Sequence, residues 1–241
     1  MDNLNYFTIG SIVALNFNTA RVFQKFGIDF CCRGNLTITE ACSAKNLNQE
    51  EVETEIISVL NAVGTSSIDY NSWPIDLLAD YIEKTHHRYV AERIPEINLF
   101  LAKLCKVHGS RHPELFEIYK HFMTSSEELS MHMRKEENVL FPYIRKLVES
   151  VRQQVEPEPP HFRTVQNPIA MMMQDHEAEG KRFMEISDLS NNYTPPSDAC
   201  TTYRVTYQML KDYEQDLHTH IHLENNILFP KAIEMEQKLQ S

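Results

Sequence analysis

The sequence lacks the features that mark nucleic-acid-binding, membrane and secreted proteins. Its 34 acidic residues outnumber its 23 basic residues, whereas binding a phosphate backbone calls for a basic face. No apolar run approaches the roughly 20 residues that a membrane-spanning helix needs. The first residues also lack the basic segment of a secretory signal. We therefore expect a cytoplasmic protein that binds neither nucleic acid nor membrane.

Cysteine use is also unlike that of a secreted protein. The chain has five cysteines, an odd number, and Cys31 and Cys32 are adjacent. Adjacent Cα atoms lie about 3.8 Å apart, which is less than the roughly 4.4 Å that disulfides usually span. The pattern does not indicate a disulfide framework, and it favours a reducing compartment.

Glycine is scarce, with six residues in the chain, and the alternation typical of strands is rare. Helical periodicity predicts an all-α fold. Residues 1–66 are expected to form a small N-terminal domain of short helices. In it, Gly27 ends one helix, Thr37 and Glu40 form a capping box, and Asn48 begins a helix that runs to about residue 63. Residues 67–73 are the expected linker.

Residues 74–241 are expected to form an up-and-down four-helix bundle. Long helical patterns lie near 74–106, 112–153, 165–190 and 197–239, and Pro74 suits the first turn of its helix. Glycine, proline or asparagine clusters separate these segments. Short polar connections between long helices favour antiparallel neighbours.

Two segments of the expected bundle repeat each other. His132 and Glu136 recur 88 residues later as His220 and Glu224, and both pairs are followed by Asn, Leu, Phe and Pro at the same spacing. This coincidence indicates an internal duplication of two helix pairs. Residues four apart share one helix face, so each His and its Glu point the same way.

The duplication predicts one further ligand on the first helix of each half. His176 precedes His220 by 44 residues, and His87 precedes His132 by 45 residues. His86 fits the apolar stripe of its own helix better than His87 does. We favour His87 on the repeat spacing, and Pro95 on the same helix could rotate the face through a kink.

These residues form a ligand set for two metal ions. A buried carboxylate is very unfavourable unless it is paired or bound to a metal. Two histidines for each metal, one oxygen from each of two shared glutamates and a bridging oxygen leave both metals near five-coordinate, which suits iron, whereas structural zinc prefers a closed tetrahedral site. Zinc and manganese remain alternatives on ligand type alone. The predicted ligands are His87, His132, Glu136, His176, His220 and Glu224.

Other polar residues of the bundle carry weaker signals. Glu128 is either an exposed acid or a proton-handling group near the metals. Glu137 and Asp175 are expected to be solvated. His218 and His222 are expected to be solvated or to support the ligands from outside.

The adjacent cysteines form the other candidate site. Cys31 and Cys32 lie between two short helices, where Arg33 could lower the pKa of a thiol. Two interpretations stay open on chemistry alone. The pair is either a reactive or iron-handling dithiol, or two small buried apolar residues.

Three sets of residues resemble one known family. Residues 22–34, Val-Phe-Gln-Lys-Phe-Gly-Ile-Asp-Phe-Cys-Cys-Arg-Gly, resemble the N-terminal cysteine-pair domain of the repair-of-iron-centres family, which are iron–sulfur cluster repair di-iron proteins. The segments His132–Pro142, His220–Pro230 and Gln174–Gly180 resemble the hemerythrin-like domain of that family. The resemblance covers nearly the whole chain, in the expected order.

The resemblance implies a non-haem centre of two Fe ions, bridged by an oxo group and by the carboxylates of Glu136 and Glu224. The terminal ligands would be His87, His132, His176 and His220, because the family's first histidine stands eight residues before a Pro-Glu pair, here Pro95-Glu96. The functional cysteine pair would be Cys31 and Cys32.

The resemblance also implies a function. Family members restore iron–sulfur clusters damaged by oxidative or nitrosative stress, and supplying iron is the favoured route, so damaged iron–sulfur proteins are expected partners. A nitric oxide-reducing di-iron enzyme and a carrier or sensor of O2 or NO are the alternatives. All three need the same ligands, so the sequence does not separate an iron donor from an enzyme. A homodimer is a further open alternative.

Overall fold

The computed structural model describes residue 4, residues 7–62 and residues 68–240. In these ranges the secondary structure is helical, apart from an isolated antiparallel bridge between Thr8 and Thr37. The predicted all-α class is therefore confirmed. No helix in the described ranges is both long and apolar enough to cross a membrane.

The N-terminal part is a group of short helices. They are α1 (Ile9–Leu15), η2 (Phe17–Thr19), α2 (Ala20–Lys25), α3 (Ile38–Lys45) and α4 (Gln49–Asn61).

The predicted helix ends of this part are present. Gly27 has a φ of +63°, which glycine adopts without strain. The Thr37 hydroxyl accepts from the Glu40 N–H while the Glu40 carboxylate accepts from the Thr37 N–H, which is a capping box. Asn48 caps α4, which ends at Asn61; residue 63, the expected end, lies outside the described residues. Of the expected linker, residue 67 also lies outside them, and Tyr70–Ser72 (η3) form a 3-10 turn.

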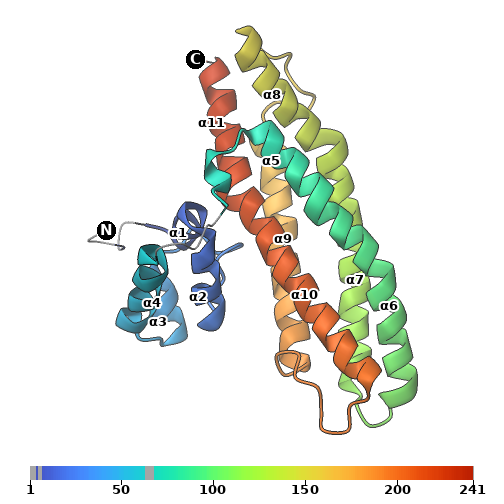
Figure 1. Cartoon of the computed structure of the whole chain (residues 1–241). Coiled ribbons are helices and arrows are strands. Elements are labelled where there is room, and N and C mark those ends of the chain that lie inside the picture. The colour runs from blue at the N-terminus through green and yellow to red at the C-terminus, as the bar shows by residue number, and fades with distance from the viewer. Residues whose placement is uncertain (1–3, 5–6, 63–67, 241) are drawn as a thin grey trace.

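Four long helical rods form the bundle (Figure 1). The first consists of α5 (Ile75–Tyr81), η4 (Ile82–His87) and α6 (Arg88–His108), and the second of α7 (Glu114–Lys135), η5 (Glu136–Leu140) and α8 (Phe141–Gln153). The third is α9 (Gln166–Leu189), and the fourth consists of α10 (Thr201–Leu223), η6 (Glu224–Leu228) and α11 (Phe229–Gln240). The four predicted long helices are confirmed.

Three of the rods contain a π-helical turn, in η4, η5 and η6. The repeated prolines give a physical reason for two of them. Pro142 has no N–H to donate to residue 138, and its ring crowds that carbonyl, so the helix widens over η5. Pro230 stands in the same relation to residue 226 in η6. Pro95 lies inside α6, C-terminal to η4. The helix face that points to the bundle core therefore changes at the π turn η4 rather than at this proline.

The N-terminal part packs against the fourth rod through a close backbone approach. The Asn226 side chain donates to the carbonyl oxygens of Phe30 (3.2 Å) and Cys31 (3.3 Å). A Cβ atom at Gly10 or Gly34 would overlap the same side chain, so both positions need glycine. This contact sets the cysteine loop against η6.

The apolar core falls into two clusters. One joins the N-terminal helices to the α6, α7 and α10 part of the bundle, and the other lies among α5, α8, α11 and the start of α9. Along their rods the buried residues His87, Glu136 and His176 stand between residues of one cluster and residues of the other. The polar layer between the two clusters is where the candidate site lies.

Candidate metal centre

The structure brings the six predicted ligands together in this polar layer. Each is buried, with at most 2% of its surface exposed. His87 ends η4, and Glu136 and Glu224 begin η5 and η6. The other three stand on uninterrupted helix: His132 on α7, His176 on α9 and His220 on α10.

Four of these residues form a first donor group. The Nε2 atoms of His87 and His220 lie 3.1 Å apart. His87 Nε2 is 3.4 Å from Glu136 Oε2, and His220 Nε2 is 3.2 Å from Glu224 Oε1. One ligand atom from each of the four residues lies within 4.8 Å of the others.

The second donor group shares the same two carboxylates. The Nε2 atoms of His132 and His176 lie 3.0 Å apart. His132 Nε2 is 3.2 Å from Glu136 Oε2, and His176 Nε2 is 3.2 Å from Glu224 Oε2. Glu224 thus presents Oε1 to one group and Oε2 to the other, which is the arrangement that a bridging carboxylate requires.

The donor atoms fit two transition-metal ions. Two imidazole nitrogens that each lie about 2.1 Å from one metal are about 3.0 Å apart at a right angle and about 3.4 Å apart at a tetrahedral angle. The observed separations of 3.0 and 3.1 Å match the right angle, and so favour a coordination number above four. Both Glu136 oxygens and Glu224 Oε2 are buried without a hydrogen bond, which a bound cation would remedy.

The charges of the site support one another. Burial lowers the pKa of His87 and His132, but the nearby carboxylates outweigh it and raise both pKa values to about 10. Burial raises the pKa of Glu136 and Glu224, and the histidines more than offset it, so both pKa values are lowered. In His220 burial prevails and the pKa is lowered.

Three of the four histidines are held through their second ring nitrogen. Glu137 Oε1 lies 2.9 Å from His87 Nδ1. Asp175 Oδ2 lies 3.2 Å from His132 Nδ1, and Asn225 Oδ1 lies 2.8 Å from His176 Nδ1. Such partners fix the ring orientation and the tautomer that leaves Nε2 free to bind. His220 Nδ1 is buried without a hydrogen-bond partner in the described part of the chain.

Glu137 and Asp175 were expected to be solvated, and their contacts with ligand histidines were not predicted; Asn225 was missed. The two carboxylates are partly exposed, yet each contacts a ligand histidine on another helix. Each of the three residues directly follows or precedes a predicted ligand in the sequence. This adjacency could have identified them, because a residue next to a ligand lies on the same helix turn and can face the next helix of the bundle.

His87 and not His86 reaches the donor groups. His86 is buried, its Nδ1 lies 2.9 Å from Asp216 Oδ1, and its ring stacks on His220 at 5.8 Å. The π turn η4 spans both histidines and adds one residue to the helix register. The stripe argument assumed a regular α-helix, and it therefore pointed one residue too early.

His218 and His222 are not solvated. Both rings pack edge-on against Phe30 of the N-terminal part. Burial lowers the pKa of His222 to about 4 and also lowers that of His218. Glu128, for which two interpretations were open, is half exposed and forms an ion pair with Arg182.

The two cysteines lie at the interface between the N-terminal part and the bundle. Cys31 is buried and Cys32 is partly exposed, and their sulfur atoms are 3.7 Å apart, as free thiols. The Cys32 thiol donates to the backbone carbonyl of His176 at 3.4 Å. This contact thus joins the cysteine pair directly to the backbone of one candidate ligand, His176.

The expected activation of a thiol by Arg33 is not found for Cys31. The hydrogen bond with Cys32, burial and the negative charge of Asp29 all raise the pKa of the Cys31 thiol well above its usual range. Arg33 is exposed, and it is not among the groups that shift this pKa. The raised pKa favours the protonated form of the Cys31 thiol.

Comparisons with known proteins match both parts of the chain. ScdA_N, described as a domain of unknown function (DUF542), matches residues 6–60, and the hemerythrin HHE cation binding domain matches residues 79–232. The chain is similar to the iron-sulfur cluster repair protein YtfE of Yersinia pseudotuberculosis serotype IB (strain PB1/+) and of Yersinia pestis (strain Pestoides F). Each is 31% identical to it over 229 residues, covering 95% of this chain and 97% of the relative.

Proposed function

Because the chain belongs to the family of iron–sulfur cluster repair proteins, with an ScdA_N domain followed by a hemerythrin domain, we propose that it repairs damaged iron–sulfur clusters. The proposed mode is the supply of iron from two ions held in the bundle. The observation that carries this proposal is the pair of donor groups that share two buried carboxylates.

In this proposal His87 and His220 would hold one iron, His132 and His176 would hold the other, and Glu136 and Glu224 would contribute carboxylate oxygens to both. A bound iron pair supplies exchangeable ferrous ions and redox chemistry at the site. The chain's own residues orient the donor nitrogens. Glu137, Asp175 and Asn225 contact the Nδ1 atoms of three ligand histidines and so fix their imidazole rings.

Exchange of iron is supported by the access routes. A cavity of about 430 Å³ reaches His87 and Glu137 from one side, and another of about 230 Å³ reaches His132 and His176. The donors are therefore buried, yet each group is adjacent to a cavity through which a small ion or a small molecule could pass.

The proposed partners are damaged iron–sulfur proteins, and the proposed location is the cytoplasm. The five cysteines are free thiols, which suits a reducing compartment. No observation favours the alternatives, reduction of nitric oxide or carriage of O2 or NO, over repair. A homodimer stays a prediction.

The test is recovery of a dehydratase whose [4Fe–4S] cluster has been damaged by nitric oxide. The chain loaded with ferrous iron under anaerobic conditions should restore activity faster than the same concentration of free ferrous iron. Glu224→Leu should lose this advantage, and Glu234→Leu, at an exposed acid of the same rod, should keep it. Equal recovery with free iron and loaded chain would refute repair by iron supply, and nitrous oxide formation without recovery would favour the enzyme alternative.

A further inference from the structure

A second group of metal-binding side chains lies outside the bundle centre, at the interface between the two parts of the chain. Asp29, Cys31 and Cys32 each offer one ligand atom, and these atoms lie within 4.8 Å of one another. We propose that this trio is a separate, open metal site for a borderline divalent cation such as Fe2+, Zn2+ or Co2+, placed to receive an ion from the bundle or pass one to it.

The sulfur separation fits thiolate ligands of one metal. Two sulfurs that each lie about 2.3 Å from a tetrahedral metal are about 3.8 Å apart. The Cys31 and Cys32 sulfur atoms are 3.7 Å apart, without a disulfide between them. Adjacent cysteines do not form an unstrained disulfide, so the arrangement suits a shared cation better than a redox bond.

Asp29 is positioned as the third ligand. Its Oδ1 atom accepts from the N–H groups of Cys31 (3.0 Å) and Cys32 (2.9 Å), and the Cys31 thiol donates to it at 3.3 Å. A sulfur and an oxygen on one tetrahedral metal would be about 3.5 Å apart. Lys25 and Lys45 line the same cavity as Asp29, and Lys25 forms its ion pair with Glu55 rather than with Asp29.

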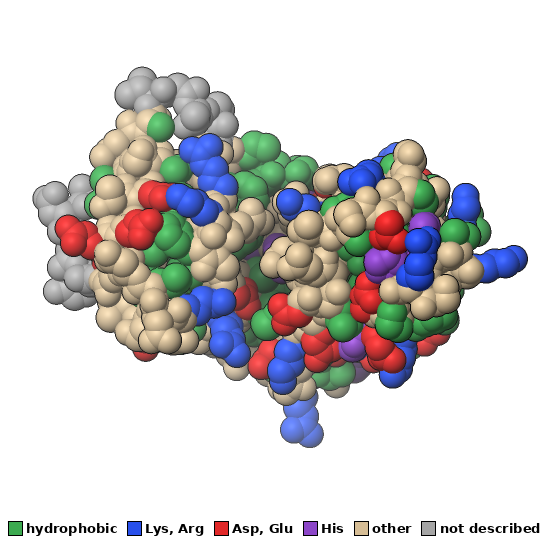
Figure 2. All heavy atoms as spheres, turned by 90° about the horizontal axis from the view of Figure 1, so that it is seen from below, with side chains coloured by type: hydrophobic (Ala, Val, Ile, Leu, Met, Phe, Trp, Pro, Cys, Tyr) green, Lys and Arg blue, Asp and Glu red, His purple; other side chains and the backbone are tan. Residues whose placement is uncertain are grey.

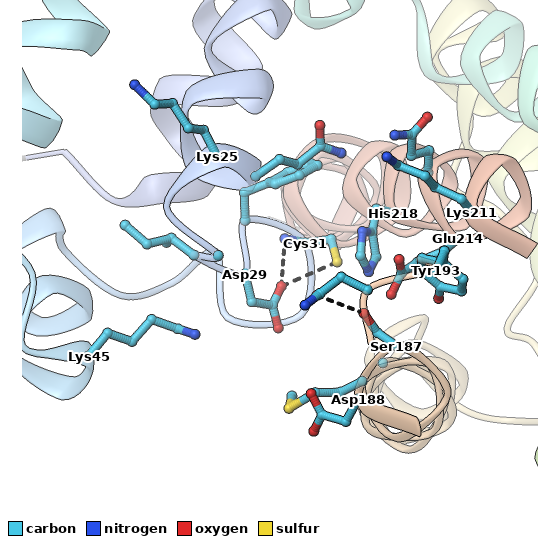
Figure 3. Close-up of a pocket in the computed structure, with 18 residues that line it drawn as sticks. Lys25, Asp29, Cys31, Lys45, Ser187, Asp188, Tyr193, Lys211, Glu214 and His218 are labelled. Atoms are coloured by element: carbon cyan, nitrogen blue, oxygen red, sulfur yellow. Dashed lines mark hydrogen bonds between the residues drawn. The ribbon is translucent and has the colours of Figure 1, made fainter. Parts of the chain in front are cut away.

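Two residues of the trio, Asp29 and Cys31, line a cavity that an incoming ion could use. A cavity of about 630 Å³ lies between the N-terminal part and the bundle, lined by Asp29, Cys31 and, from α10, His218 (Figure 3). Figure 2 shows the surface hollowed between the two parts. Three protein ligands and one open position are typical of sites where a metal exchanges ligands, whereas a closed set of four is typical of structural sites.

Two contacts join this trio to the bundle centre. Cys32 Sγ lies 3.4 Å from the carbonyl oxygen of His176. Asn225 donates to the Cys31 carbonyl at 3.4 Å while its oxygen faces His176 Nδ1 at 2.8 Å. A cation at the thiols would therefore lie next to the helix that carries a proposed iron ligand. The role in passing iron rests on the proposed function, but the metal site itself does not.

The ligand chemistry selects the class of cation. Two thiolates with one carboxylate favour borderline metals over Mg2+ and Ca2+, which prefer oxygen ligands. Binding would replace the two thiol protons, which leave to solvent, so affinity for the cation should rise with pH.

The test is an anaerobic titration of the full chain with Co2+, after the bundle has been filled with iron. Sulfur-to-cobalt charge-transfer absorption reports thiolate ligation, which the nitrogen and oxygen donors of the bundle cannot give. We expect one saturable equivalent in the wild type. Cys31→Ser and Cys32→Ser should each abolish that band, and Asp29→Asn, which keeps the acceptor for both N–H groups, should weaken binding about tenfold or more.

Two controls separate this site from others. Cys200→Ser removes an exposed thiol elsewhere and should leave the band unchanged. Glu136→Leu disturbs the bundle centre and should also leave it unchanged. Absence of the band in the wild type, its survival in Cys32→Ser, or its loss in Cys200→Ser would overturn the proposal. A chain that shows the band but restores no damaged cluster would refute the proposed function and leave this site standing.

Discussion

Replacing Asn225 with alanine should weaken iron binding in the bundle although Asn225 is not a proposed ligand. When His176 binds a metal through Nε2, its proton must be on Nδ1, which lies 2.8 Å from Asn225 Oδ1. The substitution removes this acceptor and frees the ring to rotate. Loss of such a partner typically lowers metal affinity by about 10- to 100-fold.

The partial exposure of Asn225 places the expected loss of iron affinity near the lower limit of that range. Asn225 is half-buried, so water can reach the exposed N–H in the variant and replace part of the lost hydrogen bond. We expect a decrease of about tenfold in the affinity for one of the two irons, or about 1.4 kcal/mol. The measurement is iron per chain after equilibrium dialysis of the loaded protein against increasing concentrations of a chelator.

Asn226→Ala is the matched control. Asn226 is the next residue, is equally half-buried, and also donates to the Cys31 carbonyl, but its other contacts are Phe30 and His222. Loosening of the cysteine loop should therefore occur in both variants, whereas weaker iron binding should occur only in Asn225→Ala. Equal iron retention in the two variants would refute the role assigned to the hydrogen bond with His176.

Three further predictions follow from the same geometry. Without metal, the protein should lose stability as the pH rises from about 6.5 to about 10. Protonated His87 and His132, with pKa values of about 10, stabilise the fold only until they deprotonate. Thermal denaturation should show this decline in the metal-free protein and should not show it in the metal-loaded protein. Glu136→Leu should remove at least one metal by elemental analysis, and retention of two would contradict a bridging role. Gly34→Ala should destabilise the chain by about 1–3 kcal/mol in urea unfolding, because the new Cβ would lie 2.8 Å from the Phe30 carbonyl oxygen; an unchanged midpoint would show that this loop adjusts freely.

The sequence by itself was sufficient for the fold class and the four rods, and it nominated six candidate ligands that the structure brings together. Helical periodicity and capping depend on residues a few positions apart, so Thr37, Asn48 and Gly27 marked helix ends without tertiary information. The ligand set was accessible for a different reason. A duplicated segment keeps the spacing of its functional residues, so the offset between His132 and His220 also located the histidines of the two preceding helices.

The tertiary structure alone decided which side chains support these ligands and where the cysteines lie. The repeat spacing already favoured His87, and the structure shows why the α-helical stripe pointed to His86 instead: a π turn shifts the helix register by one residue. Asp175 reaches His132 from a different helix, so their contact depends on how α7 and α9 pack. Cys32 meets the carbonyl of His176 across 144 positions of sequence, because the close approach at Gly10 and Gly34 docks the N-terminal part on η6.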